Sequence, residues 1–439
     1  MAFITADRVL DSSTSTGTGA FVVSGTPAAG YQTFSSVMSI GDTCYYSIQG
    51  QTTSEWEVGL GTYSSANTLT RTTVYSSSNS NTAVTFSAGT KNVFITVAAS
   101  KSYQQDPSGN ANLTGTAVMG SSFLRNRLIN GNMYAAQRAT SATVTAGTTV
   151  PTATTGYPCV DRWFVYSTGA NVTAAQVAGS GANKNLLQIT GAASVTAIGI
   201  GQRIEQLNSY DLAGQTCTLS VSIANSLLTT VTWTASYATT TANTFGTIGT
   251  ATKTQISTGT FTVNSTLTRY TVNIAVPAAA TTGIEVLFTV GAQTSGTFQI
   301  TEAQFEPGSI ATPFERKNYQ QQLNECFRYY FKMTVGTIGD QFGAGGVSTT
   351  SLARVFTQFV VPMWAAPTSI VTSGTAADYS VLGAAATITA CTAVPTFNSS
   401  STFAAGTVFT TGATLVLGQA IFGRASATTA YLAWPSEIP

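Results

Sequence analysis

Charged side chains are scarce in this chain, and their scarcity limits the kinds of site that it can build. Only 8% of the 439 residues are charged, and none is histidine. General acid–base catalysis needs titratable groups gathered in a pocket, and a Ser–His or Cys–His pair cannot form without histidine. We therefore expect a structural or binding protein, and not an enzyme.

The charges that are present nearly cancel. The formal net charge is +1, so the sequence provides neither a basic field for nucleic acid nor an acidic one for cations. A surface with so few charges must consist of neutral polar side chains or be covered by other copies of the chain. Both arrangements are expected of a protein that works inside a larger assembly.

No metal, cofactor or membrane segment is expected. Carboxylates are too sparse to predict a calcium site. The N-terminus shows no signal-peptide pattern, and no apolar run approaches the roughly 20 residues that span a bilayer. The five cysteines are far apart and lack metal-ligand spacing, so we interpret them as buried thiols made in a reducing cytoplasm. They are Cys44, Cys159, Cys217, Cys326 and Cys391.

Apolar and polar residues alternate in many short runs. In residues 216–223, Cys217, Leu219, Val221 and Ile223 share one face, and hydroxyl residues share the other. A period of two with many β-branched and aromatic residues is typical of half-buried antiparallel strands. Similar runs at regular spacing predict an all-β fold class of tandem β-sandwich or jelly-roll domains. They lie at 55–60, 231–237, 270–276 and 284–290.

One segment departs from this alternation. Between Asn318 and Met333, apolar residues recur every three or four positions, which predicts an amphipathic helix of about four turns. We place this helix at 317–335. Composition divides the rest of the chain into an N-terminal β domain, a polar linker, a jelly-roll domain and a distal β domain. Their predicted limits are 1–100, 101–124, 125–316 and 336–439.

Three groups of short motifs resemble proteins of tailed-bacteriophage virions. The first includes Ala6-Asp7-Arg8, Glu55-Trp56-Glu57 and Phe86-Ser87-Ala88-Gly89, and it is similar to an N-terminal module of tail fibres. The second resembles the jelly-roll region of phage tail proteins, which is similar to carbohydrate-binding modules. It includes Asn126-Arg127-Leu128-Ile129-Asn130-Gly131, Asp161-Arg162-Trp163 and Glu306-Pro307-Gly308-Ser309. The third, Gln322-Leu323-Asn324-Glu325-Cys326, resembles the segment that follows that region.

The resemblance implies a virion structural protein, made in the host cytoplasm and assembled as a homotrimeric tail fibre. Residues 1–100 would attach to other virion proteins, and the later domains would bind host-surface glycan. Two alternatives stay open. One is a component that does not adsorb to cells, such as a capsid fibre, a decoration protein or a tail adaptor. The other is a polysaccharide depolymerase, which would need two carboxylates across a cleft.

Four rare charges lie among apolar residues of the jelly-roll domain. A buried charge must be paired, so we interpret these residues as a structural ion-pair network. A polar binding pocket is the alternative. The four residues are Asp161, Arg162, Arg203 and Glu205.

Four aromatic residues are further candidates. Core packing explains Trp364 and Trp434 least, and exposed indoles stack on sugars, so these two are predicted to contact ligand. Tyr329 and Tyr330 lie on the predicted helix, and aromatic residues are enriched between subunits. We therefore predict that these tyrosines pack at a subunit interface.

Overall fold

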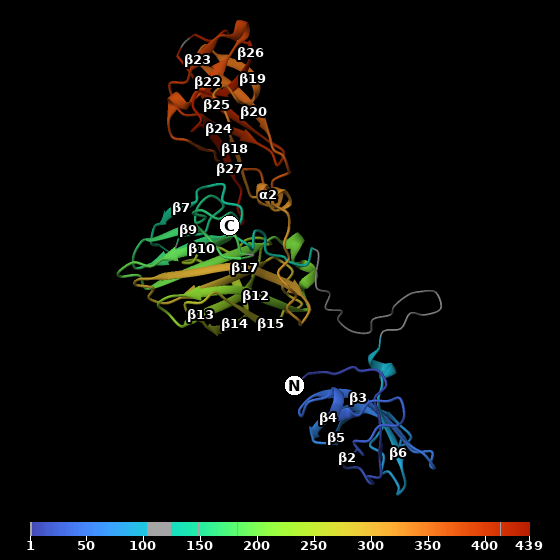
Figure 1. Cartoon of the computed structure of the whole chain (residues 1–439). Helices are drawn as coiled ribbons and strands as arrows, with labels where there is room; N and C mark the ends of the chain where they lie inside the picture. Colours follow the sequence, from blue (N-terminus) through green and yellow to red (C-terminus); the bar gives the residue numbers. More distant parts are fainter. Residues whose placement is uncertain (1, 103–123, 148, 182, 413) are drawn as a thin grey trace. The chain divides into compact units, whose positions relative to one another are not determined.

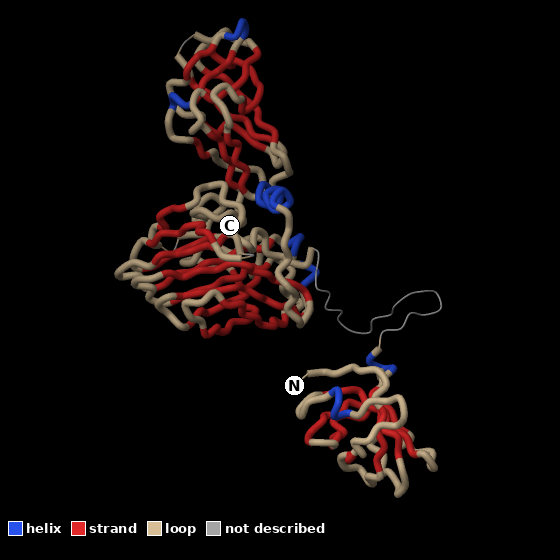
Figure 2. The backbone as a smooth tube through the Cα atoms, in the orientation of Figure 1, coloured by secondary structure: helices blue, strands red, loops and turns tan. Residues whose placement is uncertain are grey.

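The computed structural model describes residues 2–102, 124–147, 149–181, 183–412 and 414–439. Strands dominate these residues (Figure 2), as the all-β prediction requires. The chain forms two compact units, Met1–Ala117 and Val118–Pro439. Most of the predicted linker at 101–124 lies outside the described residues. Within the described part, no helix is long and apolar enough to cross a membrane.

The first unit is built on one six-stranded sheet with the order β1-β6-β3-β4-β5-β2 (Figure 1). Alternate residues of β3 face the core, so Cys44, Tyr46 and Ile48 are buried beside Tyr63 of β4. The elements are β1 (Leu10–Ser13), β2 (Phe21–Val22), α1 (Phe34–Val37), β3 (Thr43–Gly50), β4 (Trp56–Ser65), β5 (Thr68–Ser77) and β6 (Lys91–Ile95).

The second unit begins with a sandwich of two antiparallel sheets, which is the predicted jelly-roll domain. The six-stranded sheet has the order β15-β12-β17-β10-β9-β7, and the five-stranded sheet has the order β14-β13-β16-β11-β8. The strands are β7 (Ser141–Val144), β8 (Phe164–Thr168), β9 (Val172–Ala178), β10 (Asn185–Thr190), β11 (Ala197–Ile204), β12 (Thr216–Asn225), β13 (Thr230–Ala238), β14 (Lys253–Thr262), β15 (Thr268–Ala275), β16 (Ile284–Val290) and β17 (Thr297–Pro307).

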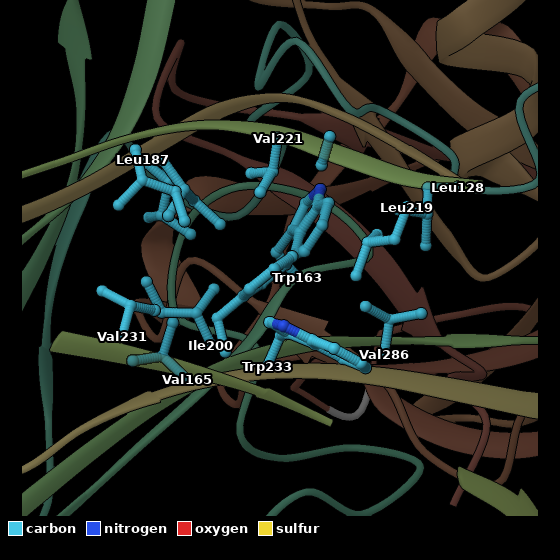
Figure 3. Close-up of a cluster of buried hydrophobic side chains, with 14 of the residues drawn as sticks. Leu128, Trp163, Val165, Leu187, Ile200, Leu219, Val221, Val231, Trp233 and Val286 are labelled. Atoms are coloured by element: carbon cyan, nitrogen blue, oxygen red, sulfur yellow. The ribbon is translucent and has the colours of Figure 1, made fainter. Parts of the chain in front are cut away.

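The core of this sandwich lies between its two sheets. Trp163 and Trp233 lie at the centre of the cluster in Figure 3, with aliphatic side chains of both sheets around them. The alternating residues of β12 that the sequence placed on one face all contribute to this core. Burying such side chains contributes about 25 cal/mol per Å² of apolar surface removed from water, which favours this pairing of the sheets.

The predicted helix is shorter than expected, and this is a correction. Helix α2 (Tyr319–Phe327) has nine residues instead of the span 317–335. Its start agrees with the prediction, because Asn318 Oδ1 accepts the Gln321 N–H at 2.8 Å. Residues Tyr330–Thr334 form strand β18, which pairs antiparallel with the last strand, Tyr431–Pro435. This long-range pairing overrides the local helical spacing.

The rest of the second unit is a smaller sandwich. A three-stranded sheet, β18-β27-β21, packs against a seven-stranded sheet with the order β23-β22-β26-β19-β20-β25-β24. We call the larger one the distal sheet. The strands are β18 (Tyr330–Thr334), β19 (Gln341–Thr349), β20 (Leu352–Gln358), β21 (Val371–Thr372), β22 (Tyr379–Leu382), β23 (Ile388–Ala390), β24 (Thr396–Ser400), β25 (Ala404–Thr410), β26 (Ala420–Ala425) and β27 (Tyr431–Pro435).

Candidate functional site

Two of the predicted charged residues hold the end of the chain against the jelly-roll domain. Arg162 forms an ion pair with Glu437, and both side chains are buried. Arg203 Nη1 donates to the carbonyl of Ile438 at 3.1 Å, while its Nε donates to Glu285 at 2.8 Å. The last residues of the chain are therefore fixed by arginines of the sandwich.

Glu205, at the end of β11, binds the residues that follow helix α2. Its carboxylate accepts bonds from Arg328 at 2.7 and 2.9 Å, and from the Tyr329 hydroxyl at 2.9 Å. Burial raises the pKa of Glu205, but the bonds from Arg328 and Tyr329 outweigh it, so the pKa lies below its usual value. The carboxylate is therefore ionised and fully engaged.

Asp161 occupies the same region. Its Oδ2 accepts from Gln137 Nε2 at 2.7 Å, and its Oδ1 lies 3.7 Å from Arg138 Nη1. Burial raises the pKa of Asp161 to about 6, against the attraction of Arg138. The four predicted charges thus form ion pairs with other residues and not with one another, although Arg162 donates to the backbone carbonyl of Arg203. We call this buried cluster, with Arg328, Tyr329 and Glu437, the charged junction.

The tyrosines predicted for a subunit interface lie inside the chain, which corrects that expectation. Tyr329 is fully buried, and the guanidinium of Arg162 lies 3.6 Å from its ring centroid. Tyr330 is also buried, with Arg138 at 3.7 Å from its ring centroid. Both rings pack between elements of one chain and offer no exposed surface to a second copy.

The two tryptophans predicted to contact ligand differ in their surroundings. Trp434 is fully buried and stacks on Phe331 at 6.0 Å, so this prediction is wrong for Trp434. Trp364 is half-buried and packs against a cluster of buried residues that includes Tyr329 and Ile438. Its indole N–H has no hydrogen-bond partner among the described residues. Neither ring forms an open platform.

An open apolar surface lies on the outer face of the distal sheet. Phe356 is 57% exposed and Phe422 is 43% exposed, and both are paired in register with Ala344 of the strand between them. Further cross-strand partners, Leu382 and Ile388, extend the set beyond Phe422. We call it the apolar row, and it consists of Ile388, Leu382, Phe422, Ala344 and Phe356.

Small residues shape this surface. Gly406 is the cross-strand partner of Phe356 on β25, and a Cβ atom there would lie 3.4 Å from the Phe356 ring. The ring therefore lies over glycine backbone and keeps its other face open. Sequence reasoning missed Phe356, although a signal was present. In the alternating run 352–358, Ala353, Val355 and Thr357 face inward, so the phenylalanine stands on the polar face.

A second open surface is a groove of about 600 Å³ beside helix α2. Amide side chains line it, together with Glu325, Arg328 and residues 361–362, and no aromatic residue contributes to its lining. Among the described residues, no three His, Cys, Asp or Glu side chains come together as metal ligands. Other rings are exposed as well, such as Tyr210 and the pair Tyr134 and Tyr319. The apolar row differs in placing two exposed phenylalanines on one face of a sheet.

No known protein family matches this sequence, and no curated protein matches it. Solved structures resemble part of the fold. A family 4 carbohydrate-binding module shares 14% identity over 41% of this chain and 98% of its own, with a TM-score of 0.27. The CBM22-1 xylan-binding domain of a Paenibacillus barcinonensis protein shares 12% over 34% and 87%, with a TM-score of 0.23.

A phage protein is also among the similar structures. The enzymatically active domain of tailspike protein 4 from bacteriophage CBA120 shares 17% identity, covering 37% of this chain and 21% of that one, with a TM-score of 0.25. The neighbours are thus carbohydrate-binding modules with jelly-roll folds and a phage tailspike domain. Similarity at this level assigns neither a ligand nor an activity to the present chain.

Proposed function

We propose that this chain is a non-enzymatic attachment protein of a tailed-phage virion, which binds host-surface glycan on its distal sheet. The observation that carries the binding is the apolar row, where two exposed phenylalanines stand on one open face. Flat aromatic rings pack against the C–H faces of sugar rings. The virion assignment rests on the motif resemblance, whose short blocks lie between Ala6 and Cys326.

The state of the carboxylates supports a binding protein over a depolymerase. Glu285 is engaged by Arg203 and Lys253, and Glu306 accepts bonds from Thr312 and Gln304. These carboxylates stabilise the sandwich, because each one compensates neighbouring donors in a buried site. A pair of them facing each other across an open cleft would be required for glycoside hydrolysis.

Attachment would be multivalent. A single open face offers few contacts, but three copies on one fibre raise the effective concentration of the second and third sites. The first unit is compact by itself, which suits a separate anchor to the particle. We therefore propose a homotrimer that is made in the host cytoplasm and joins the virion through residues 1–100.

An array of purified bacterial surface polysaccharides tests this function. The full chain should bind members of the array, and the double variant Phe356→Ala, Phe422→Ala should lose that binding while remaining folded. Tyr210→Ala removes an exposed ring from the jelly-roll domain and should bind as the parent does. A folded parent that binds nothing, or a double variant that binds normally, would refute the proposal.

A non-adsorbing structural component is the second candidate, because an exposed apolar row can also be covered by another copy of the chain. Light scattering on the same proteins separates the two functions. If the parent forms an oligomer and the double variant is a monomer, the row is a subunit contact and the structural candidate is favoured. If the oligomer is unchanged while polysaccharide binding is lost, attachment is favoured.

A further inference from the structure

Two arginines stand beside the apolar row on the same face of the distal sheet. Arg354 precedes Phe356 by two residues in β20, and Arg424 follows Phe422 by two residues in β26. Residues two apart in a strand share a face. Arg354 is paired with Gly346 and Arg424 with Gln341, so the arginines lie on opposite sides of the row.

Neither arginine forms an ion pair within the part of the chain that the structure describes. Their side chains form no hydrogen bond or ion pair with any residue that the structure describes, whereas Arg71, Arg162 and Arg203 each pair with a buried carboxylate. None of the seven strands of the distal sheet contains Asp or Glu. The strands of this sheet therefore carry two arginines and no carboxylate of their own.

The nearest carboxylates in the sequence bind other groups and form no ion pair with Arg354 or Arg424 among the described residues. Asp340, just before β19, accepts the N–H groups of Gly336 and Thr337. Asp378 accepts the Thr429 hydroxyl at 3.1 Å, and Glu437 lies in the charged junction. In a chain with so few charges, two unpaired arginines beside an aromatic surface indicate an anionic partner.

We infer that the apolar row and its two arginines bind an acidic polysaccharide whose sugars carry carboxylates, an inference that rests on the proposed function. Phe356 and Phe422 lie on strands separated by one other strand, a spacing of roughly 10 Å, which suits stacking on an extended chain of sugars. Each arginine is roughly 7 Å from its phenylalanine along the strand. A guanidinium can bind a carboxylate with two parallel bonds, which a neutral sugar does not offer.

The test uses an array of acidic bacterial polysaccharides, each placed beside its carboxyl-reduced form. Reduction removes the charge and keeps the sugar backbone. We expect parent binding to fall at least about tenfold on reduction, and the variant Arg354→Gln, Arg424→Gln to show the same loss on the acidic forms. Binding of the parent to acidic forms should also weaken as salt is raised from about 50 to 300 mM. Binding by the double arginine variant, and binding of the parent to the reduced forms, should weaken less over the same range.

Two controls complete the design. Lys184→Gln removes one exposed cation from the jelly-roll domain and should leave binding unchanged. Thermal unfolding of each variant shows that it is folded. If the parent binds the reduced forms equally well, the carboxylates of the ligand are not recognised; if the double arginine variant binds as the parent does, the two arginines do not recognise them. In either case only this inference fails. If the folded parent binds no member of the array, the proposed function fails with it.

Discussion

Arg328 donates to both carboxylate oxygens of Glu205, from Nη2 to Oε1 at 2.7 Å and from Nε to Oε2 at 2.9 Å. Two parallel bonds fix direction as well as distance between these groups. Arg328 ends helix α2, and Glu205 follows β11 of the jelly-roll domain. The pair therefore holds the segment that leads into the distal sheet in one orientation.

Replacing Glu205 with Gln should lower the free energy of unfolding of the second unit by about 1–3 kcal/mol, because the charge-assisted bonds to Arg328 and Tyr329 become weaker. Urea unfolding followed by tryptophan fluorescence measures this change. Asp211→Asn is the matched control, since Asp211 forms a more exposed ion pair with Arg127 and should cost less than about 1 kcal/mol. Equal losses in both variants would contradict a special role for Glu205.

Removing the charge of Glu437 should lower the free energy of unfolding more than removing the charge of Glu205. Arg162 is buried, so Glu437→Gln leaves its guanidinium without a counter-charge, and we expect a loss of about 3–5 kcal/mol. Denaturant unfolding checks the value, with Glu325→Gln as the control because its ion pair with Lys317 is more accessible to water. A loss below about 1 kcal/mol would show that the C-terminal residues are not held as the structure describes.

The sequence allowed part of this arrangement to be predicted. Strand β12 was predictable because its apolar residues all face one core, so the period of two is local information. The burial of Arg162 was predictable as a paired charge, but its partner was not, because Glu437 lies 275 positions away. Strand β18 was missed for the same reason, since its partner strand, β27, lies far along the chain at Tyr431–Pro435. Phe356 could have been found, because an aromatic residue on the polar face of a strand needs an explanation.

Stability of the second unit should depend on Asp161 at mildly acidic pH. Burial raises the pKa of Asp161 to about 6, so the folded state binds this proton more tightly than the unfolded state does. The contribution is complete below pH ~4 and is lost as pH rises through ~6, by up to about 3 kcal/mol. Asp161→Asn should remove this component.

The measurement is the difference in unfolding free energy between parent and Asp161→Asn at several pH values. Taking the difference removes the contributions of other groups, such as Glu205, whose lowered pKa makes stability fall at acidic pH. The parent should lose stability relative to the variant between pH 4 and 6.5. A difference that does not change with pH would show that Asp161 is ionised throughout this range.

Trp434 should matter for stability and not for binding. Its ring is buried between Phe331 and Phe359, so Trp434→Ala should cost about 3–5 kcal/mol through the cavity that it leaves. Trp434→Phe should cost less, because the indole N–H has no partner among the described residues. Polysaccharide binding by folded Trp434→Phe should equal that of the parent, and a selective loss of binding would restore Trp434 as a ligand contact.

The first unit has its own buried charge, which allows its independence to be tested. Glu57 is fully buried and accepts bonds from Arg71 at 2.8 Å, from the Tyr46 hydroxyl at 2.6 Å and from the Val84 N–H at 2.7 Å. Glu57→Gln removes the charge that compensates a buried guanidinium, so it should destabilise this unit by about 3 kcal/mol. Hydrogen exchange should rise across residues 10–95 and stay unchanged across 125–439, because the two units are separately compact. The carboxylate of Glu55 binds the exposed Ser87, so Glu55→Gln is the control and should destabilise the unit less. Faster exchange in both units would contradict their independence.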